Sequence, residues 1–281
     1  MPGDYAFLVA GLPTLSLEID SRGFSFVRLR NEVNELLGDD DKLAMAWLFY
    51  PSDNRNLLLL LAGKAVDPDP TGNFSAVELA SFLEDPALAP AYMRDFLQMH
   101  FAKESFPDSD VISTQFASHP ELHLLNRFYL GASSVAHRFV RDWLEFDRDF
   151  RNIVAAYAAR LWQKPTNSEL VGEGSLVESL SGNSTPELLT GPEEEWMRNL
   201  LEVLPLRPAI AREKQLDLIR WQWLDSYTAF HYLDEYVVFA HMLKAGIVER
   251  WLRLDPKSGM ELFRRMMAQT RGTYRLADAL E

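Results

Sequence analysis

The loop Asp67–Glu78 places side chains at the spacing of a calcium-binding loop. Carboxylates or hydroxyls stand at positions 1, 3, 5, 9 and 12, with a glycine at position 6, as in an EF-hand. The calcium ligands would include Asp67, Asp69 and Glu78. Prolines at positions 2 and 4 stiffen the backbone where ligands must converge, and no second loop pairs with this one. The same residues also predict a capping box, in which Ser75 and Glu78 begin a helix, and this simpler interpretation is favoured.

Two groups of histidines have spacings that metal sites use. His119 and His123 are four residues apart, which places them on one face of a helix. Asp234 and His241 are seven apart and would form one wall of a helical-bundle metal site. That group has four members: His231, Asp234, Glu235 and His241. Because the paired Glu-x-x-His motifs of such sites are missing, we expect surface, helix-cap or core hydrogen-bonding roles, with no metal and no other cofactor.

The sequence contains none of the common catalytic motifs. It has no cysteine, no G-x-S-x-G elbow, no S-x-x-K, no H-E-x-x-H and no glycine-rich phosphate loop. A nucleophile with its activating partner is therefore not recognisable. We expect a protein that is not an enzyme.

Helical patterns dominate the elements that would position these residues. Leu216–Leu254 runs without a proline and is rich in Trp, Tyr and Phe, which predicts one buried helical element or two in tandem. Ser133–Gln163 has apolar residues every three or four positions, which predicts a long two-faced helix. Two shorter helices, Leu43–Tyr50 and Asn54–Lys64, are expected on either side of Pro51, which should end the first. Further helices are expected at 76–83, 90–105, 119–130, 192–204 and 259–270.

Two further segments complete the prediction of the fold. Tyr5–Leu12 is a short apolar run that is either an extended strand or one buried turn. Residues 165–192 are rich in Ser, Gly, Pro and Thr and predict a flexible or weakly helical connector. No internal repeat is visible. We expect an all-α protein in which residues 1–281 form a single multi-helix domain, with the connector inside it.

Charge is distributed unevenly. The net charge is −13, which disfavours general nucleic-acid binding, because phosphate repels an acidic surface. Residues 1–125 hold 8 Lys and Arg against 19 Asp and Glu, whereas residues 244–281 hold 8 against 5. The basic carboxyl-terminal part is either a partner surface or a solvated face. Its candidate contact residues are Arg250, Arg253, Lys257, Arg264, Arg265 and Arg271.

Several features bear on localisation. The absence of cysteine suits a reducing compartment, and the amino terminus has no basic region before its apolar run, unlike a signal peptide. The longest near-apolar run, Tyr236–Val248, is interrupted by charge and is shorter than the ~20 residues of a membrane span. We expect a soluble, cytoplasmic chain.

A family resemblance goes beyond these inferences. It rests on four blocks: YAFLVAGLPTLSLE at Tyr5–Glu18, and the segments Phe139–Trp162, Arg220–Trp251 and Leu254–Phe263. Together they resemble an uncharacterised bacterial family encoded within V-type ATPase operons. That family is similar to the V/A-type ATPase subunit called C in bacteria and d in eukaryotes.

The resemblance implies an all-helical, funnel-like protein without chemistry of its own. Such a subunit sits on the cytoplasmic mouth of the membrane rotor ring, receives the central stalk and passes torque between them. Its partners would be the central-stalk and rotor-ring subunits, and it would be peripheral to the inner membrane. Two alternatives stay open at this point: a helical adaptor or assembly factor for that ATPase, and a metal-binding helical enzyme that uses the histidine groups above.

Overall fold

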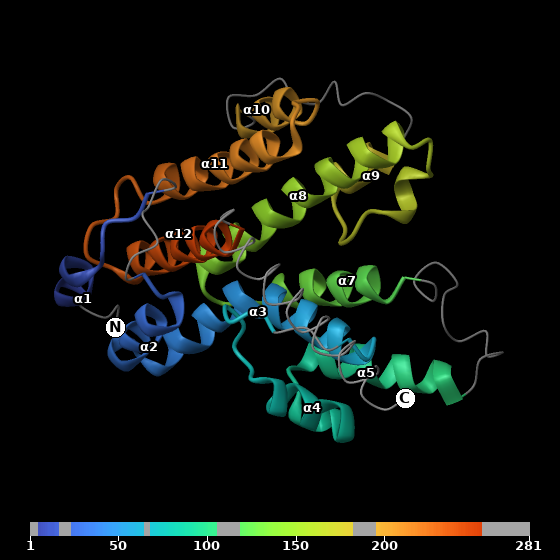
Figure 1. Ribbon diagram of the computed structural model, residues 1–281, viewed down its shortest axis with the longest axis horizontal. Coiled ribbons are helices and arrows are strands. Elements are labelled where there is room, and N and C mark those ends of the chain that lie inside the picture. The colour runs from blue at the N-terminus through green and yellow to red at the C-terminus, as the bar shows by residue number, and fades with distance from the viewer. Residues whose placement is uncertain (1–4, 17–23, 65–67, 106–118, 182–194, 255–281) are drawn as a thin grey trace, which may run out of the picture. The chain divides into compact units, whose positions relative to one another are not determined.

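A computed structural model describes residues 5–16, 24–64, 68–105, 119–181 and 195–254, and these residues are all-helical, without a strand. The all-α expectation is confirmed. The helices are labelled in Figure 1. The chain divides into two compact units. The terminal unit comprises Met1–Leu36 and His231–Glu281, and the central unit comprises Leu37–Phe230. The single domain expected over residues 1–281 stays a prediction. The division rests on contacts within each unit, and such contacts do not show whether the two units fold cooperatively.

The first half of the central unit is a group of packed helices. Helix α3 packs against α4, α7 and α8, and α5 packs against α7. Their bounds are α3 Asp39–Leu61, α4 Ala76–Glu84, η1 Pro86–Leu88, α5 Ala91–Ser105 and α7 Pro120–Ala132. Helix α4 begins with the expected capping box: the Glu78 amide donates to Ser75 Oγ at 3.3 Å, and the Ser75 amide donates to Glu78 Oε2 at 2.7 Å.

The second half of the central unit is organised around its long helix α8. Short segments η2 and α9 pack on α8, and α10 packs on α11. The bounds are α8 Arg138–Leu161, η2 Thr166–Ser168, α9 Ser175–Ser181, α10 Glu195–Val203 and α11 Ala209–Tyr227. Aromatic side chains join α8 to α11, with ring centroids 5.5 Å apart for Trp143 and Trp223 and 4.7 Å apart for Phe146 and Trp223.

The terminal unit brings both ends of the described chain together. It holds α1 (Ala6–Gly11), α2 (Phe26–Leu36) and α12 (Glu235–Leu254), and α12 contacts the other two. The Phe26 amide at the start of α2 donates to the Glu249 carboxylate of α12 at 3.3 Å. This carboxylate satisfies an amide that has no partner within α2 and complements the positive end of the helix dipole.

The expectation that Pro51 ends a helix is wrong, because α3 continues through it to Leu61. Proline in a helix interior removes one backbone hydrogen bond and costs about 3 kcal/mol. Apolar side chains of α3 are buried on both sides of the proline, including Leu48, Phe49 and Leu57. Tertiary packing along the whole helix therefore outweighs the local cost.

The structure also specifies elements whose type or number the sequence left open. The run at Tyr5–Leu12 is helical, as α1. The aromatic segment Leu216–Leu254 is two helices in tandem: α11 ends at Tyr227 and α12 begins at Glu235, and they belong to different units. The helix expected at 259–270 lies outside the described residues. Among the described residues, none of the helices combines the length and the low charge that crossing a membrane requires.

Candidate functional site

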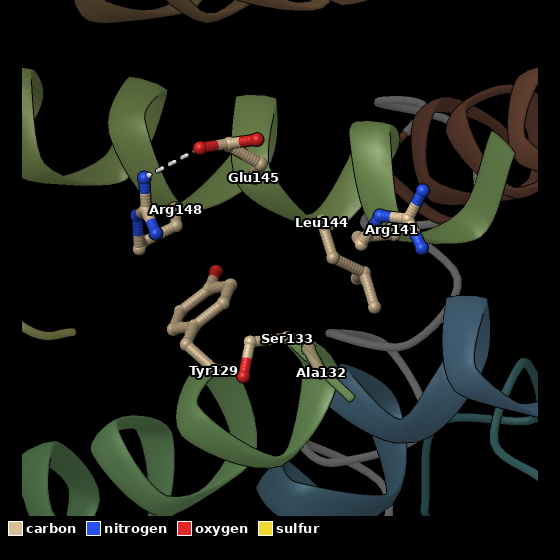
Figure 2. A pocket seen from close by; sticks show the side chains of 7 residues that line it. All are labelled: Tyr129, Ala132, Ser133, Arg141, Leu144, Glu145 and Arg148. Carbon is tan, nitrogen blue, oxygen red and sulfur yellow. Dashed lines mark hydrogen bonds and ion pairs between the residues drawn. The ribbon is translucent and has the colours of Figure 1, made fainter. Parts of the chain in front are cut away.

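A small cavity between α7 and α8 gathers several polar side chains of the central unit (Figure 2). Its volume is about 110 Å³, which is room for a few water molecules. In Figure 2 the Tyr129 hydroxyl points from α7 toward α8. We call this space the α7–α8 cavity, and it is lined by Tyr129, Ala132, Ser133, Arg141, Leu144, Glu145 and Arg148.

The charged groups of the α7–α8 cavity are balanced by neighbours on their own helix. The Arg148 guanidinium lies 2.8 Å from the Asp149 carboxylate and 3.4 Å from Glu145. Burial raises the pKa of Asp149, and the adjacent Arg148 opposes that rise. The Arg148 stem lies against Gly172, where an added Cβ would come within 2.7 Å of Arg148 Cδ. This arginine is thus positioned by packing as well as by charge.

Tyr129 connects the cavity to a network of charged residues behind it. Its hydroxyl donates to Asp147 Oδ2 at 2.8 Å, and Arg220 lies 3.9 Å from Asp147 and 3.2 Å from the buried Asp217. Burial, together with the Asp147 carboxylate, raises the pKa of Tyr129 well above 10. The phenol therefore stays protonated at neutral pH and acts as a hydrogen-bond donor, which suits structural bonding rather than proton transfer.

A second polar network, which the sequence analysis missed, connects the loop 68–75 to α3. Asp53 is fully buried, and its Oδ1 accepts from the amides of Asn73 at 2.7 Å and Phe74 at 2.9 Å. Its Oδ2 accepts from the Asn73 side chain at 2.6 Å. Asn56 holds the backbone of Asp69 through its amide group, with distances of 2.7 and 3.1 Å. We call these contacts the Asp53 latch.

The signal for this latch is present in the sequence. Ser52, Asp53, Asn54 and Asn56 follow Pro51 and separate two mainly apolar stretches of the chain, Leu43–Tyr50 and Leu57–Leu61. All four are buried, and buried polar groups are normally hydrogen-bonded. A polar run between two apolar stretches of one helix therefore predicts a loop or helix that packs against it.

The latch also determines the surroundings of the calcium candidates. Asp67 lies outside the described residues. The Asp69 carboxylate accepts from Arg55 at 2.7 Å and from the Thr71 hydroxyl at 2.7 Å. Glu78 bonds Ser75, and these bonds lower its pKa. Asp69 thus belongs to the loop that the Asp53 latch holds, whereas Glu78 belongs to the capping box of α4.

The first histidine pair is divided between surface and interior. His119 precedes α7 and is exposed, whereas His123 is buried beside the Phe96 ring, with ring centroids 5.4 Å apart. Burial lowers the pKa of His123, and Arg127 and His100 act in the same direction. The structure does not present these two side chains as a matched pair on one surface.

The second histidine group surrounds the start of α12. His231 Nδ1 lies 2.6 Å from Asp234 Oδ2, and the His231 ring stacks on Tyr236. Asp234 Oδ1 accepts from the Val237 amide at 3.4 Å, as an N-cap does. Burial lowers the pKa of His241 to about 4, with Lys244 acting in the same direction. Within the described ranges, no group of three or more His, Cys, Asp and Glu residues could hold a metal ion.

The predicted basic surface is described only in part. Arg250 and Arg253 lie on the last turns of α12, and the Arg250 guanidinium lies 5.7 Å from the centre of the Trp251 ring. The other members, Lys257, Arg264, Arg265 and Arg271, lie outside the described residues. The interaction surface as a whole stays a prediction.

The comparisons with known proteins give a family. A family model described as "Protein of unknown function (DUF2764)" matches residues 2–272. Comparison with curated proteins and with solved structures finds no match.

Proposed function

Taking as premise that the chain belongs to this family of unknown function, we propose that it is a non-catalytic subunit of a bacterial V/A-type rotary ATPase. In this role it couples the central stalk to the membrane rotor ring and carries out no chemical step. The chain would be cytoplasmic and bound to the inner membrane through its partners.

The observation that carries the proposal is where the resembling blocks lie in the fold. Phe139–Trp162 covers helix α8 except for its first residue and ends one residue beyond it, and the first part of Arg220–Trp251 is the end of α11. These two segments meet in one aromatic contact, which includes Trp143, Phe146, Phe150, Trp223 and Tyr227. The resembling residues of these two segments are therefore packing residues of the central unit.

Two further contacts strengthen the junction between α8 and α11. The Arg220 guanidinium lies 4.0 Å from the centre of the Phe150 ring, and the Tyr227 hydroxyl donates to Asp142 at 2.7 Å. Aromatic pairs contribute about 0.5–1.5 kcal/mol each beyond burial, and close-packed interiors have low compressibility. A body built in this way resists deformation, as a torque-transmitting part must.

The opening block and the second part of Arg220–Trp251 belong to the terminal unit, whereas the block Leu254–Phe263, apart from Leu254, lies outside the described residues. The Tyr5 amide donates to the Leu233 carbonyl at 3.3 Å, and α1 contacts α12. The opening block and the second part of Arg220–Trp251 therefore pack together, although more than 200 residues of the chain separate them. This long-range packing supports an architectural role for both blocks under the proposal.

The composition of the native complex tests the proposal. An affinity-tagged chain, extracted gently from membranes, should appear in native mass spectra with central-stalk and rotor-ring subunits at a fixed stoichiometry. Recovery as a free monomer alone would overturn the proposal. Recovery in sub-stoichiometric amounts, only with incomplete complexes, would instead identify an assembly factor.

Removal of the chain gives an independent functional test. In membranes that lack it, ATP hydrolysis by the catalytic part should continue, while ATP-driven ion transport should fall to background because torque no longer reaches the ring. Restoring the chain should restore transport. Unchanged transport in its absence would contradict the coupling role.

A further inference from the structure

An open groove in the central unit lies between the first turns of α3 and the turn that leads into α8. Its volume is about 510 Å³, within the range of small-molecule pockets. We call it the α3–α8 groove, and its lining residues are Asp40, Asp41, Leu43, Ala44, Trp47, Ser134, Val135, Ala136 and His137.

The apolar part of the groove is preformed. Leu43 is 70% exposed although it is a large apolar residue, and Trp47 lies one turn further along the same helix. The Trp47 ring is fixed from behind by Phe128 and Tyr50, with ring centroids 5.9 and 5.3 Å away. An added Cβ at Gly131 would lie 3.3 Å from Trp47 Cη2, so the backbone of α7 approaches the ring closely. Rigid apolar surface next to an exposed leucine is typical of an anchor site.

The other end of the groove is acidic. Asp40 is exposed and Asp41 is half-buried, and both lie in the first turn of α3. Lys42, their neighbour on α3, pairs with Asp39 at 3.5 Å and is not among the lining residues of the groove. Acidic residues in a first helical turn interact favourably with the helix dipole, and here they line the same groove as Leu43 and Trp47. The groove therefore complements a partner segment that carries a basic side chain close to an apolar one.

We propose that the α3–α8 groove binds a basic amphipathic helical segment of another protein. An apolar side chain of the partner would pack between Leu43 and Trp47, and a Lys or Arg one helical turn away would pair with Asp40 and Asp41. This is the helix-in-groove mode of recognition, with anchors at i and i+4 spacing. The net charge of −11 in residues 1–125 attracts such a segment at longer range. The identity of the partner as an ATPase subunit rests on the proposed function, whereas the chemistry of the groove does not.

A model peptide tests the chemistry directly. The probe is a fluorescent synthetic helix with Leu and Lys at i,i+4 spacing, titrated with the full chain in fluorescence anisotropy. The variant Asp40→Asn/Asp41→Asn, and separately Leu43→Ser, should each weaken binding by about tenfold or more. Circular dichroism verifies that both variants are folded.

A matched control separates the groove from general attraction to an acidic protein. Glu173→Gln/Glu178→Gln removes the same charge from exposed positions at and beside α9 and should leave the dissociation constant within about twofold. Equal weakening by this control, or no weakening by the groove variants, would overturn the proposal.

A photo-crosslink identifies the natural occupant. A benzoylphenylalanine introduced at Leu43 should crosslink, in native membranes, to a Lys- or Arg-containing helix of another protein. A crosslink to a second copy of this chain, or no crosslink while the chain is present in the ATPase, would overturn the proposal. Absence of the chain from the ATPase would overturn the proposed function alone, and the peptide titration would still decide the groove.

Discussion

Gly72 is the residue at which the Asp53 latch leaves no room for a side chain. An added Cβ would lie 2.5 Å from Asp53 Oδ1, the atom that accepts two backbone amides. Gly72→Ala must therefore displace the carboxylate and weaken these bonds, and we expect a loss of roughly 2–3 kcal/mol in the free energy of unfolding. Urea unfolding measures it. The control Gly11→Ala, with nothing within 4 Å of the added Cβ, should change stability by less than about 0.5 kcal/mol.

His241 should make stability depend on pH. Its pKa is about 4 in the folded chain against 6.5 for a free histidine, so below pH 6.5 the unfolded chain binds a proton that the folded chain does not. The contribution of neutral His241 to the free energy of unfolding is therefore fully present above pH 6.5. It is lost as the pH falls toward 4, by at most about 3 kcal/mol. His241→Gln should flatten this part of the stability curve, measured by denaturant unfolding at several pH values. A slope equal to that of the unsubstituted chain would contradict this account.

At the scale of elements, the segment 165–181 is held by contacts that its composition does not reveal. Asn152 of α8 is fully buried and bonds both backbone groups of Val171: its side chain donates to the carbonyl at 2.8 Å and accepts from the amide at 3.0 Å. The Gly172 amide donates to Asn126 Oδ1 at 2.8 Å. The described part of the predicted connector is thus packed on the central unit, and its last residues, 182–192, lie outside the described chain.

Removing the Asn152 side chain tests this attachment. Asn152→Ala leaves both backbone groups of Val171 without their partner and should cost about 2–3 kcal/mol. Hydrogen exchange at the Val171 amide should accelerate strongly, and proteases should cleave within 165–181 sooner. Gln222→Ala, at an exposed position of α11, is the control and should change neither readout. Unchanged protection of the Val171 amide would refute the attachment.

The turn that follows α8 contains a residue in an unfavourable conformation. Gln163 has φ of 55° in a Schellman-type turn, in which the Lys164 amide donates to the Ala159 carbonyl at 2.8 Å. Only glycine adopts this region without steric cost. Gln163→Gly should therefore raise the free energy of unfolding by about 0.5–1 kcal/mol, measured by thermal unfolding. Gln163→Ala keeps the Cβ and should give no comparable gain.

At the scale of the whole molecule, the chain crosses between its two units twice, at residues 36–37 and 230–231. The single domain expected from the sequence predicts one cooperative unfolding transition. Trp223→Ala in the central unit and Phe239→Ala in the terminal unit each remove a packed aromatic ring and should each cost about 3–5 kcal/mol. Calorimetry should then show the same single transition lowered by both. Two transitions, each lowered by one variant only, would show that the units unfold separately.

Patterns within a few residues of the chain determined much of this protein. The absence of alternating apolar and polar residues and the three-to-four periodicity determined the all-helical class, and the Ser75–Glu78 spacing determined the start of α4. These features succeed because a helix and its cap are made by neighbours in sequence. The four blocks that carry the family resemblance were likewise readable from the sequence alone, since each is a continuous stretch of the chain.

Tertiary structure decided the features that depend on partners distant in sequence. Pro51 is tolerated because apolar residues on both sides of it are buried by other elements. Asp53 and Asn152 hold loops that lie about 20 residues away, and Leu43 stays exposed beside a fixed Trp47. Burial and hydrogen bonding of this kind arise only when separate elements meet, and local propensity contains no information about which elements will do so.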